Sequence, residues 1–391
     1  MPGFDAVEPE PPDFKTEHDL PLITLPKKQQ DGLTFSKQNA RAPKDFTLKE
    51  TDERYTALAS EAKAYLQAAD YVAAIPILKQ LYSEYPDDLN VVRELGRANY
   101  MADQPVGSNR MALFYLKKAR RLSPDDTETL KTLGLALYKA EELESALDVI
   151  KKYIKLEPDD RYMKQLYDKI LRENSAQDGF ILESSDHFDV YYDSINYRGL
   201  GYTVLSLLDD AYRRVGTELR LYPDRSVSVI LYSERSFREV TLGPGWTGGL
   251  YDGKIRLPIK DLDEDDPRLE HVLTHEYVHA VVHSFTKQCP TWLNEGLAMY
   301  LEGRRPAPQV RLVTDLRSLE GSFMALNAAQ AQVAYSVSFS AVSFLIERYG
   351  IDRIKYILES MKSGSSFQKA FNESMPVDYG EFIRQWNNLQ G

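Results

Sequence analysis

Three successive patterns of hydrophobic and polar residues divide the chain. Residues 1–50 show neither a helical nor a strand-like period, and they carry seven of the twenty prolines. Apolar residues recur at helical spacing over 55–174, whereas from residue 180 the period shifts toward two and returns to helical spacing beyond Asp266. The pattern predicts an extended or disordered arm over 1–50, a helical region over 55–174 and an α+β domain over 180–390.

The elements of the C-terminal domain are predicted from short runs. Alternating and β-branched residues predict strands at 180–182, 188–192, 226–232, 250–251 and 254–257, with a helix at 200–219. The first two strands are expected to pair across a short polar link. A glycine-rich loop at 243–249 leads into the last two strands. We therefore expect a small mixed sheet followed by a helical part.

The helical region contains an internal repeat marked by Pro86, Pro124 and Pro158, each of which is followed by two aspartates. An alanine lies twelve residues before each proline and an aliphatic residue lies eight before it: Ala74, Ala112 and Ala146, and Leu78, Leu116 and Ile150. The last two prolines are 34 residues apart and the first two are 38 apart, because four residues are inserted near 104–108. The pattern resembles the tetratricopeptide repeat (TPR), in which small residues let two helices approach closely and the proline ends the second helix.

This resemblance implies an all-α solenoid of three repeats with a helix that caps the stack. The repeats are expected over 55–88, 89–126 and 127–160, and the capping helix over 161–174. Stacked repeats of this kind present a concave groove, which favours docking of a peptide or protein partner. A rigid spacer is the alternative, and the sequence does not choose between the two.

Charge, cysteine content and the uncharged stretches of the chain exclude several classes of protein, and the N-terminal residues bear on its location in the cell. The chain has 48 Lys and Arg against 59 Asp and Glu, a net charge of −11, so we expect no nucleic-acid partner. The single cysteine, Cys289, excludes an internal disulfide framework. The longest uncharged stretch, 321–346, holds eight Ser, Asn or Gln residues, which predicts a buried helix and no membrane segment. The start at Met1 has no leader pattern, which favours the cytosol unless a leader has been removed.

Four of the six histidines lie four residues apart in one run, at 271, 275, 279 and 283. Asp266 is suited to be the N-cap and Pro267 the first residue of a helix that should run to about residue 285. On that helix His275 and His279 share one face and can reach a single divalent ion, while Glu276 is rotated by about 100° and stands beside it. This arrangement is typical of a zinc site with a glutamate base.

A catalytic zinc site takes three protein ligands and leaves the fourth position to water. The metzincin pattern would place Gly and His where this chain has Val282 and Phe285, and no Cys or His follows Cys289. The third ligand is therefore expected to be a carboxylate. A second helix after Pro290 would bring Glu295 back against the two histidines.

Together the two segments, His-Glu-Tyr-Val-His at 275–279 and Trp-Leu-Asn-Glu-Gly-Leu-Ala at 292–298, resemble the gluzincin superfamily of zinc metallopeptidases. The likeness is closest to the bacterial peptidase MA-like domain, which is often found behind TPR repeats, and it covers about 180–390. It implies one zinc ion per chain with Glu295 as the third ligand. It also favours the bacterial envelope if a leader has been removed.

Two further residues are candidates for supporting roles. Gluzincins often orient a ligand histidine with a carboxylate four residues after the metal glutamate, but Met299 holds that position here, so Glu302 is the replacement candidate. Tyr335 is nominated to stabilise the oxyanion, with side-chain packing as the alternative. His271 and His283 lie about 6 Å further along the helix from the ligands and are not expected to bind the ion.

These features predict a zinc-dependent metallopeptidase in which Glu276 is the general base and the repeats recruit a substrate or a protein partner. The segment 246–253 resembles the edge strand that gluzincins place above the metal, with a tight turn as the alternative. The aminopeptidase run Gly-Ala-Met-Glu-Asn is missing, which favours an endopeptidase. The alternative function is a catalytically silent interaction scaffold, and the intact Glu276 argues against it.

Overall fold

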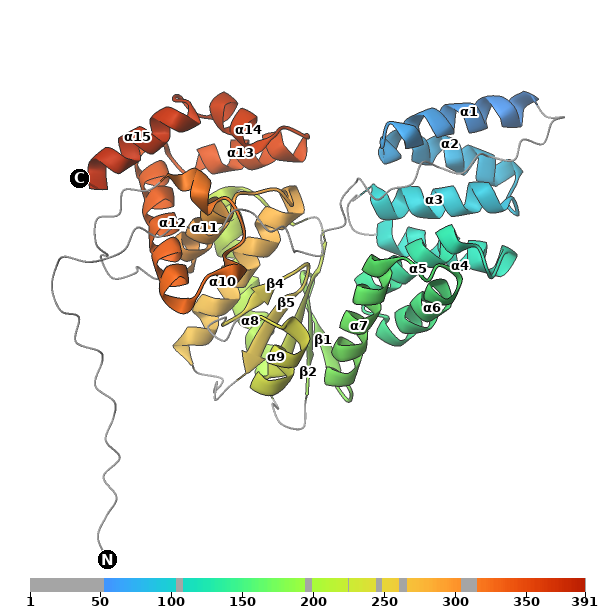
Figure 1. The fold of residues 1–391 in the computed structure, drawn as a ribbon, viewed down its shortest axis with the longest axis horizontal. Coiled ribbons are helices and arrows are strands. Elements are labelled where there is room, and N and C mark those ends of the chain that lie inside the picture. Colours follow the sequence, from blue (N-terminus) through green and yellow to red (C-terminus); the bar gives the residue numbers. More distant parts are fainter. Residues whose placement is uncertain are drawn as a thin grey trace, which may run out of the picture.

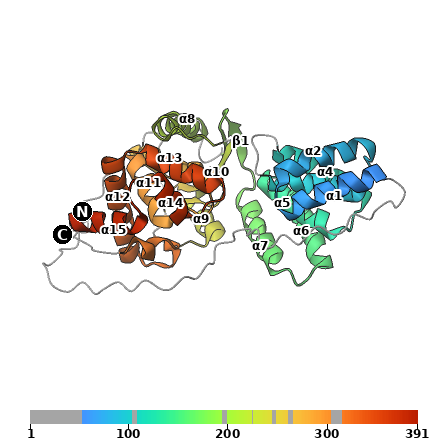
Figure 2. The ribbon, with the colours of Figure 1, turned by 90° about the horizontal axis from the view of Figure 1, so that it is seen from above.

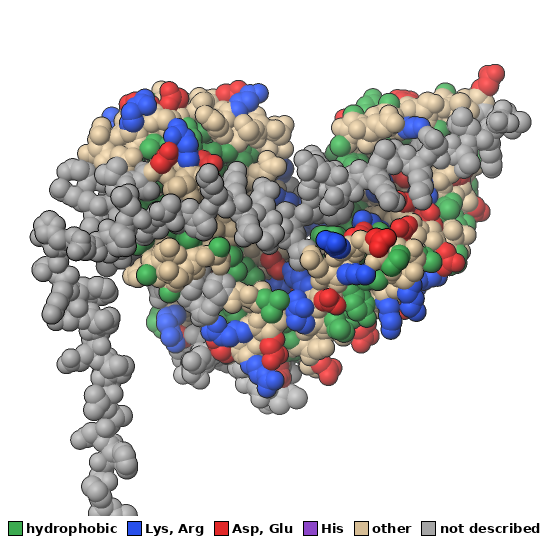
Figure 3. Space-filling model, in the orientation of Figure 1, with side chains coloured by type: hydrophobic (Ala, Val, Ile, Leu, Met, Phe, Trp, Pro, Cys, Tyr) green, Lys and Arg blue, Asp and Glu red, His purple; other side chains and the backbone are tan. Residues whose placement is uncertain are grey.

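The computed structural model describes residues 53–102, 108–193, 199–223, 225–243, 248–259, 266–303 and 315–390. The arm predicted over 1–50 and the greater part of the glycine-rich loop lie outside these ranges. Two lobes lie side by side, a helical lobe formed by the first half of the chain and a mixed lobe formed by the second (Figure 1). A notch separates their upper parts in the same view of the molecular surface (Figure 3).

Seven helices of the described chain form the N-terminal lobe as consecutive antiparallel pairs and a last helix. They are α1 (Glu53–Gln67), α2 (Tyr71–Glu84), α3 (Leu89–Met101), α4 (Ser108–Leu122), α5 (Thr127–Lys139), α6 (Leu143–Leu156) and α7 (Arg161–Ala176). The second helix of each pair ends two residues before a repeat proline, as predicted from the loss of a backbone donor at proline. The all-α TPR part of the predicted fold is confirmed.

The repeat positions have the structural roles that their residue types indicate. A Cβ atom added at Gly96 would lie 2.7 Å from the Leu116 side chain, and one added at Gly134 would lie 2.5 Å from Ile150. Each glycine therefore allows its helix to pack directly on the next one. The second aspartate after each proline caps the following helix by accepting backbone N–H bonds, at Asp88, Asp126 and Asp160.

A five-stranded mixed sheet begins the C-terminal lobe. Its strands are β1 (Ile181–Ser184), β2 (Phe188–Tyr192), β3 (Val227–Ser233), β4 (Leu250–Tyr251) and β5 (Ile255–Ile259), in the order β1-β2-β3-β5-β4. The inner pairs β2–β3 and β3–β5 are parallel, and the outer pairs β1–β2 and β4–β5 are antiparallel. The predicted mixed sheet is confirmed, and β4 forms one of its edges.

The two faces of the sheet are covered by different helices. Helices α8 (Leu200–Leu219) and α10 (Pro267–Phe285) pack on the face that carries Ile255 and Leu257, within the large core of the lobe. Helix α9 (Glu234–Thr241), which the sequence pattern did not predict, packs on the other face around Tyr232. Helix α7 of the repeats lies against α9 and stands between the two lobes (Figure 2).

The rest of the lobe is helical, as predicted. It consists of α11 (Thr291–Glu302), two 3-10 turns (Leu316–Leu319 and Phe323–Ala325), α12 (Ala328–Tyr349), α13 (Asp352–Lys362), α14 (Phe367–Ser374) and α15 (Tyr379–Gln390). Of the described helices, α12 alone is long and apolar enough to cross a membrane, yet half of its most apolar window is buried inside the protein. It packs so closely on α11 that a Cβ atom at Gly296 would lie 2.3 Å from the Ser338 carbonyl oxygen.

Candidate metal centre

Helices α10 and α11 supply the side chains of the candidate site. Asp266 caps α10 through a bond from the Arg268 backbone N–H, and Pro267 is its first residue, as predicted. Arg214 of α8 joins the two helices, because Nη2 donates to Thr274 Oγ1 (3.1 Å) and Nη1 to the Leu301 carbonyl oxygen (2.6 Å). The turn between the helices brings α11 back along α10.

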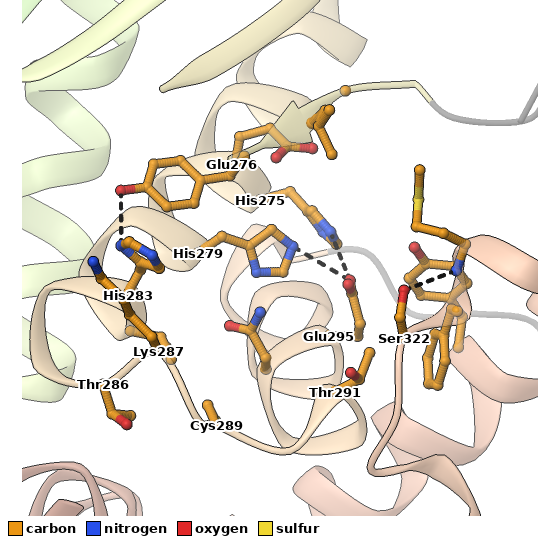
Figure 4. A pocket seen from close by; sticks show the side chains of 18 residues that line it. His275, Glu276, His279, His283, Thr286, Lys287, Cys289, Thr291, Glu295 and Ser322 are labelled. Carbon is orange, nitrogen blue, oxygen red and sulfur yellow. Dashed lines mark hydrogen bonds and ion pairs between the residues drawn. The ribbon is translucent and has the colours of Figure 1, made fainter. Parts of the chain in front are cut away.

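The structure brings His275, His279 and Glu295 together at one point (Figure 4). Glu295 Oε2 lies 3.3 Å from His275 Nε2 and 3.3 Å from His279 Nε2, and one ligand atom from each residue lies within 4.8 Å of the others. Four ligands at zinc bond lengths of about 2.0–2.1 Å form a tetrahedron with edges of about 3.3 Å. The two measured separations therefore match a shared zinc ion.

The contacts of the neighbouring carboxylates support the same interpretation. Charge-assisted hydrogen bonds are typically about 2.7–2.9 Å long, and the bond between His275 Nδ1 and Glu302 Oε2 is 2.9 Å. Glu295 Oε2, by contrast, is buried and has no hydrogen-bond partner within the described residues, although two imidazoles face it. A cation between these atoms fits such a donor set, because an unpaired buried oxygen is otherwise costly.

The electrostatics of the site favour added positive charge. Burial alone would lower the pKa of His275, but the neighbouring carboxylates of Glu295 and Glu302 outweigh it and raise the pKa to about 10. Burial alone would raise the pKa of Glu295, yet His279 and His275 hold it well below its usual range. Carboxylates that outnumber imidazoles in a buried pocket attract either protons or a divalent cation.

Glu276 stands beside this cluster and not in it, as predicted for a base. It is buried, and burial, its largest influence, raises its pKa although His279 and His275 oppose the shift. Its Oε2 atom has no hydrogen-bond partner in the described part of the chain. The backbone of Gly249, just before β4, lies so close that a Cβ atom there would be 2.5 Å from Glu276 Oε1. A glycine is therefore needed at 249 for this close approach.

Glu302, which the sequence named only as a candidate for orienting a ligand histidine, contacts His275 in the structure. Its bond to Nδ1 of His275 leaves Nε2 of the same ring facing Glu295. A carboxylate on the far nitrogen fixes the tautomer and orientation of a metal-binding histidine. The outer histidines lie elsewhere: His271 Nδ1 bonds to the Glu302 carbonyl oxygen (2.8 Å), and His283 lies beside Tyr251 (3.5 Å).

Tyr335 lines the same cavity, which has a volume of about 260 Å³. Its ring packs edge-on against Phe323 with centroids 5.6 Å apart. Burial raises the pKa of Tyr335, and the charges of Glu295 and Glu276 raise it further, so the phenol remains protonated and able to donate. His283 and Lys287 line one end of the cavity and Ser322 lines the other (Figure 4).

Several residues of the cavity were not singled out by the sequence analysis. Asn294, the residue before Glu295, has a buried Oδ1 without a hydrogen-bond partner among the described residues, and it lines the cavity. Its place in the motif next to Glu295 is a signal that was available. Tyr251 of β4 lies within the segment 246–253 that resembles an edge strand, but only the sheet shows that its side chain lines the cavity.

The comparisons with known proteins agree with this geometry. The family model described as Peptidase MA superfamily matches residues 222–390. This chain carries a Peptidase MA superfamily domain. A tetratricopeptide repeat model matches residues 107–170, so protein-interaction repeats precede the peptidase-like domain.

A search of solved structures and one of curated proteins complete the comparison. The chain is similar to the Sgt2 TPR domain from Aspergillus fumigatus at 20% identity and a TM-score of 0.29, over 34% of this chain and 88% of that chain. No curated protein matches this chain. The two family matches fit a peptidase-like protein with protein-interaction repeats.

Proposed function

We propose that this protein is a zinc-dependent metallopeptidase that cleaves within peptide chains. The observation that carries the proposal is the placement of Glu295 Oε2 at 3.3 Å from both Nε2 atoms of His275 and His279, with the buried Glu276 carboxylate beside them. The family match over 222–390 supports the same reaction class. His275, His279 and Glu295 would hold one zinc ion per chain.

Each side chain has one part in the proposed reaction. A zinc ion bound there would act as a Lewis acid and lower the pKa of a bound water toward about 7. The Glu276 carboxylate takes a proton from the attacking water and passes it to the leaving nitrogen, because its burial has raised its proton affinity. Tyr335 donates a hydrogen bond to the developing oxyanion, and Glu302 keeps the ring of His275 oriented.

The sheet edge offers a place for an extended substrate. Strand β4 pairs with β5 on one side, and within the described residues no strand pairs with its other side. A peptide that adds to this edge would run along the cavity, since Gly249, Leu250 and Tyr251 line its wall. The repeats would recruit the substrate protein or a partner that positions the enzyme.

Zinc analysis and one isosteric variant test the proposal. Purified protein is expected to contain about one zinc per chain by elemental analysis. Glu276→Gln should retain the zinc and lose about 10²–10⁴-fold in the rate of cleavage of an unfolded protein substrate. Glu270→Gln, an exposed change on the same helix, is the matched control and should cleave like the wild type.

The scaffold function gives a different result. If the wild type and Glu276→Gln are equally inert across a broad peptide library while both bind zinc, the domain binds without cutting and the proposal is wrong. If the wild type binds no zinc, the proposed metal site itself is wrong.

A further inference from the structure

The hairpin formed by β4 and β5 contacts the repeats at its turn. Asp252, Gly253 and Lys254 form this turn, in which Gly253 has a positive φ of 106°. The turn faces helices α5 and α7, and α7 stands between the lobes (Figures 1 and 2). Helix α7 and the C-terminal end of α5 with the turn after it therefore lie against the same hairpin that lines the cavity.

Six charged side chains form the contact, and we name them the junction cluster. The repeat lobe contributes Glu141, Lys169 and Glu173, and the hairpin contributes Asp252, Lys254 and Arg256. The cluster thus contains three acids and three bases. Tyr138 of α5 and Tyr232 of β3 add hydroxyl groups to it.

The contacts of the junction cluster cross between the lobes at several points. Arg256 Nη2 lies 3.0 Å from Glu173 Oε1, and Tyr138 donates to the same oxygen at 2.7 Å. Lys254 Nζ lies 2.6 Å from Glu141 Oε1 and 3.4 Å from Glu173 Oε2. Lys169 Nζ lies 2.5 Å from Asp252 Oδ2. Glu173 thus receives contacts from both cations of the hairpin.

Burial makes these pairs depend on each other. The side chains of Arg256 and Glu173 have no exposed surface. Burial would raise the pKa of Glu173, but Arg256, Lys254 and Lys169 outweigh it and hold the pKa below its usual range. An unpaired charge is very unfavourable in such a place. The hairpin therefore cannot move away from α7 without leaving buried charges unpaired.

The other end of the hairpin meets the metal centre. Gly249 precedes β4 and its backbone lies against Glu276, as the 2.5 Å approach of a built Cβ atom shows. The Tyr251 hydroxyl lies 3.5 Å from His283 Nδ1 on α10. Arg256 of β5 pairs in register with Leu250 of β4. Arg256 belongs to the junction cluster and Leu250 lines the cavity, so the two sites are connected through neighbouring residues of the sheet.

We propose that the repeat lobe positions the substrate-binding edge of the peptidase through the junction cluster, with Glu173 and Tyr138 as positioning residues for the reaction. The inference rests on the proposed function for its catalytic consequence. The stack is then neither a separate docking module nor a spacer, because its last helices hold β4 beside Glu276. A displacement of α5 or α7 would reach the cavity through the hairpin.

Hydrogen exchange and kinetics of the full chain test this inference. The variants are Glu173→Gln and the milder Tyr138→Phe, which keeps all six charges and removes the hydroxyl bond to Glu173. Glu142→Gln is the control, because it removes the exposed pair with Lys117 on the same lobe. Zinc content, amide exchange of residues 248–257, and kcat and KM for an extended peptide are measured for each protein.

The expected result is faster exchange in 248–257 with unchanged exchange in α10 and α11 and unchanged zinc. For the extended peptide kcat/KM should fall about tenfold in Glu173→Gln and less in Tyr138→Phe, chiefly through KM, because the edge that binds the peptide is displaced. A short substrate that does not reach β4 should lose less. Glu142→Gln should match the wild type.

Two results would overturn the inference. One is unchanged exchange of 248–257 in both folded variants, and the other is faster exchange without any change in kcat or KM. If Glu173→Gln does not fold, Tyr138→Phe decides between the outcomes. If the wild type cleaves no peptide but both variants show the expected faster exchange of 248–257, the proposed peptidase function is wrong. The support of the hairpin by the repeat lobe is then still confirmed.

Discussion

Two groups of buried charged residues lie at opposite ends of the β4–β5 hairpin, and they differ in their charge balance. The candidate metal centre gathers Glu276, Glu295 and Glu302 around two imidazoles, so its carboxylates outnumber its nitrogen bases. The junction cluster matches three acids with three bases. An excess of one charge in a cavity indicates a ligand that is still to be bound, whereas a balanced cluster indicates a structural joint.

The comparison also separates two uses of glutamate. Glu173 and the Oε2 atom of Glu295 are both buried, and the pKa of each residue is lowered by neighbouring cationic or protonatable groups that outweigh burial. Glu173 has Arg256 and Lys254 as permanent partners. Glu295 has only histidines, which are neutral when they bind a metal. A pKa direction alone would not distinguish the two residues, but their partners do.

Removal of a proposed metal ligand should have the largest effect of the changes considered, and it should affect the metal centre and not the junction cluster. His279→Ala is expected to lose zinc and all measurable cleavage, because two remaining ligands cannot hold the ion. Chelation of the wild type should lower its free energy of unfolding by about 4 kcal/mol if zinc is normally present at 1,000 times its Kd. Elemental analysis and thermal unfolding with and without zinc measure both effects. Retained zinc in His279→Ala would contradict the ligand assignment.

Breaking the junction pair should destabilise the fold and leave the zinc in place. Glu173→Ala is expected to lower the free energy of unfolding by about 3–5 kcal/mol, because it removes a buried carboxylate that pairs with Arg256 and leaves this cation only Asp252 and two tyrosine hydroxyls as partners. The double variant Glu173→Met with Arg256→Met should recover most of this loss, since apolar side chains remove both charges. Chemical denaturation measures the two free energies. Equal losses in the single and double variants would show that packing, and not charge, holds the joint.

Glu302→Gln should have a smaller effect confined to the metal centre. The variant keeps the shape of the side chain but weakens the bond to His275 Nδ1, so zinc affinity or activity should fall about 10–100-fold. A competition titration with a zinc chelator gives the affinity. Glu270→Gln serves as the control on α10. If Glu302→Gln binds zinc as tightly as the wild type, Glu302 does not support the metal site.

The smallest expected effect is the pH dependence of the junction cluster. The folded pKa of Glu173 lies below the unfolded value, so its contribution to stability is present above about pH 4.5 and is lost as the pH falls through the folded pKa. The stability difference between the wild type and Glu173→Gln should therefore shrink below about pH 4.5. Chemical denaturation of both proteins at pH 7 and below pH 4.5 measures this difference. If the difference in the free energy of unfolding is the same at both pH values, Glu173 is not charged in the folded protein.

Much of the site was readable from local sequence, because helix geometry fixes it. The four-residue spacing placed His275 and His279 on one face, and Asp266 with Pro267 fixed where α10 begins. The repeat was equally readable, since the small and aliphatic residues at fixed distances before each proline, such as Ala146 and Ile150, are fully buried between the helices. The role of the aspartates that cap α3, α5 and α7 was missed, although their position after each proline carried the signal.

The remaining features depend on elements that are distant in sequence. The pattern named Glu302 only as a candidate for the contact with His275, because the approach of α11 to α10 decides whether this side chain reaches Nδ1. Likewise the segment 246–253 was compared with an edge strand or a tight turn, and the structure shows that Gly249 within it admits the carboxylate of Glu276. Such contacts follow from how the sheet packs on α10.

By itself the sequence determined the order of most helices and strands, with α9 as an exception, as well as the repeat and the alignment of two imidazoles on one helix face. Each of these depends on periodicity and capping, which act over a few residues. Tertiary structure alone decided that the repeat lobe meets the β4–β5 hairpin, because Glu173 and Arg256 are 83 residues apart and each is an ordinary charged residue until burial removes its water. Only the packed interior makes their pairing obligatory, since a charge there has no solvent to replace its partner.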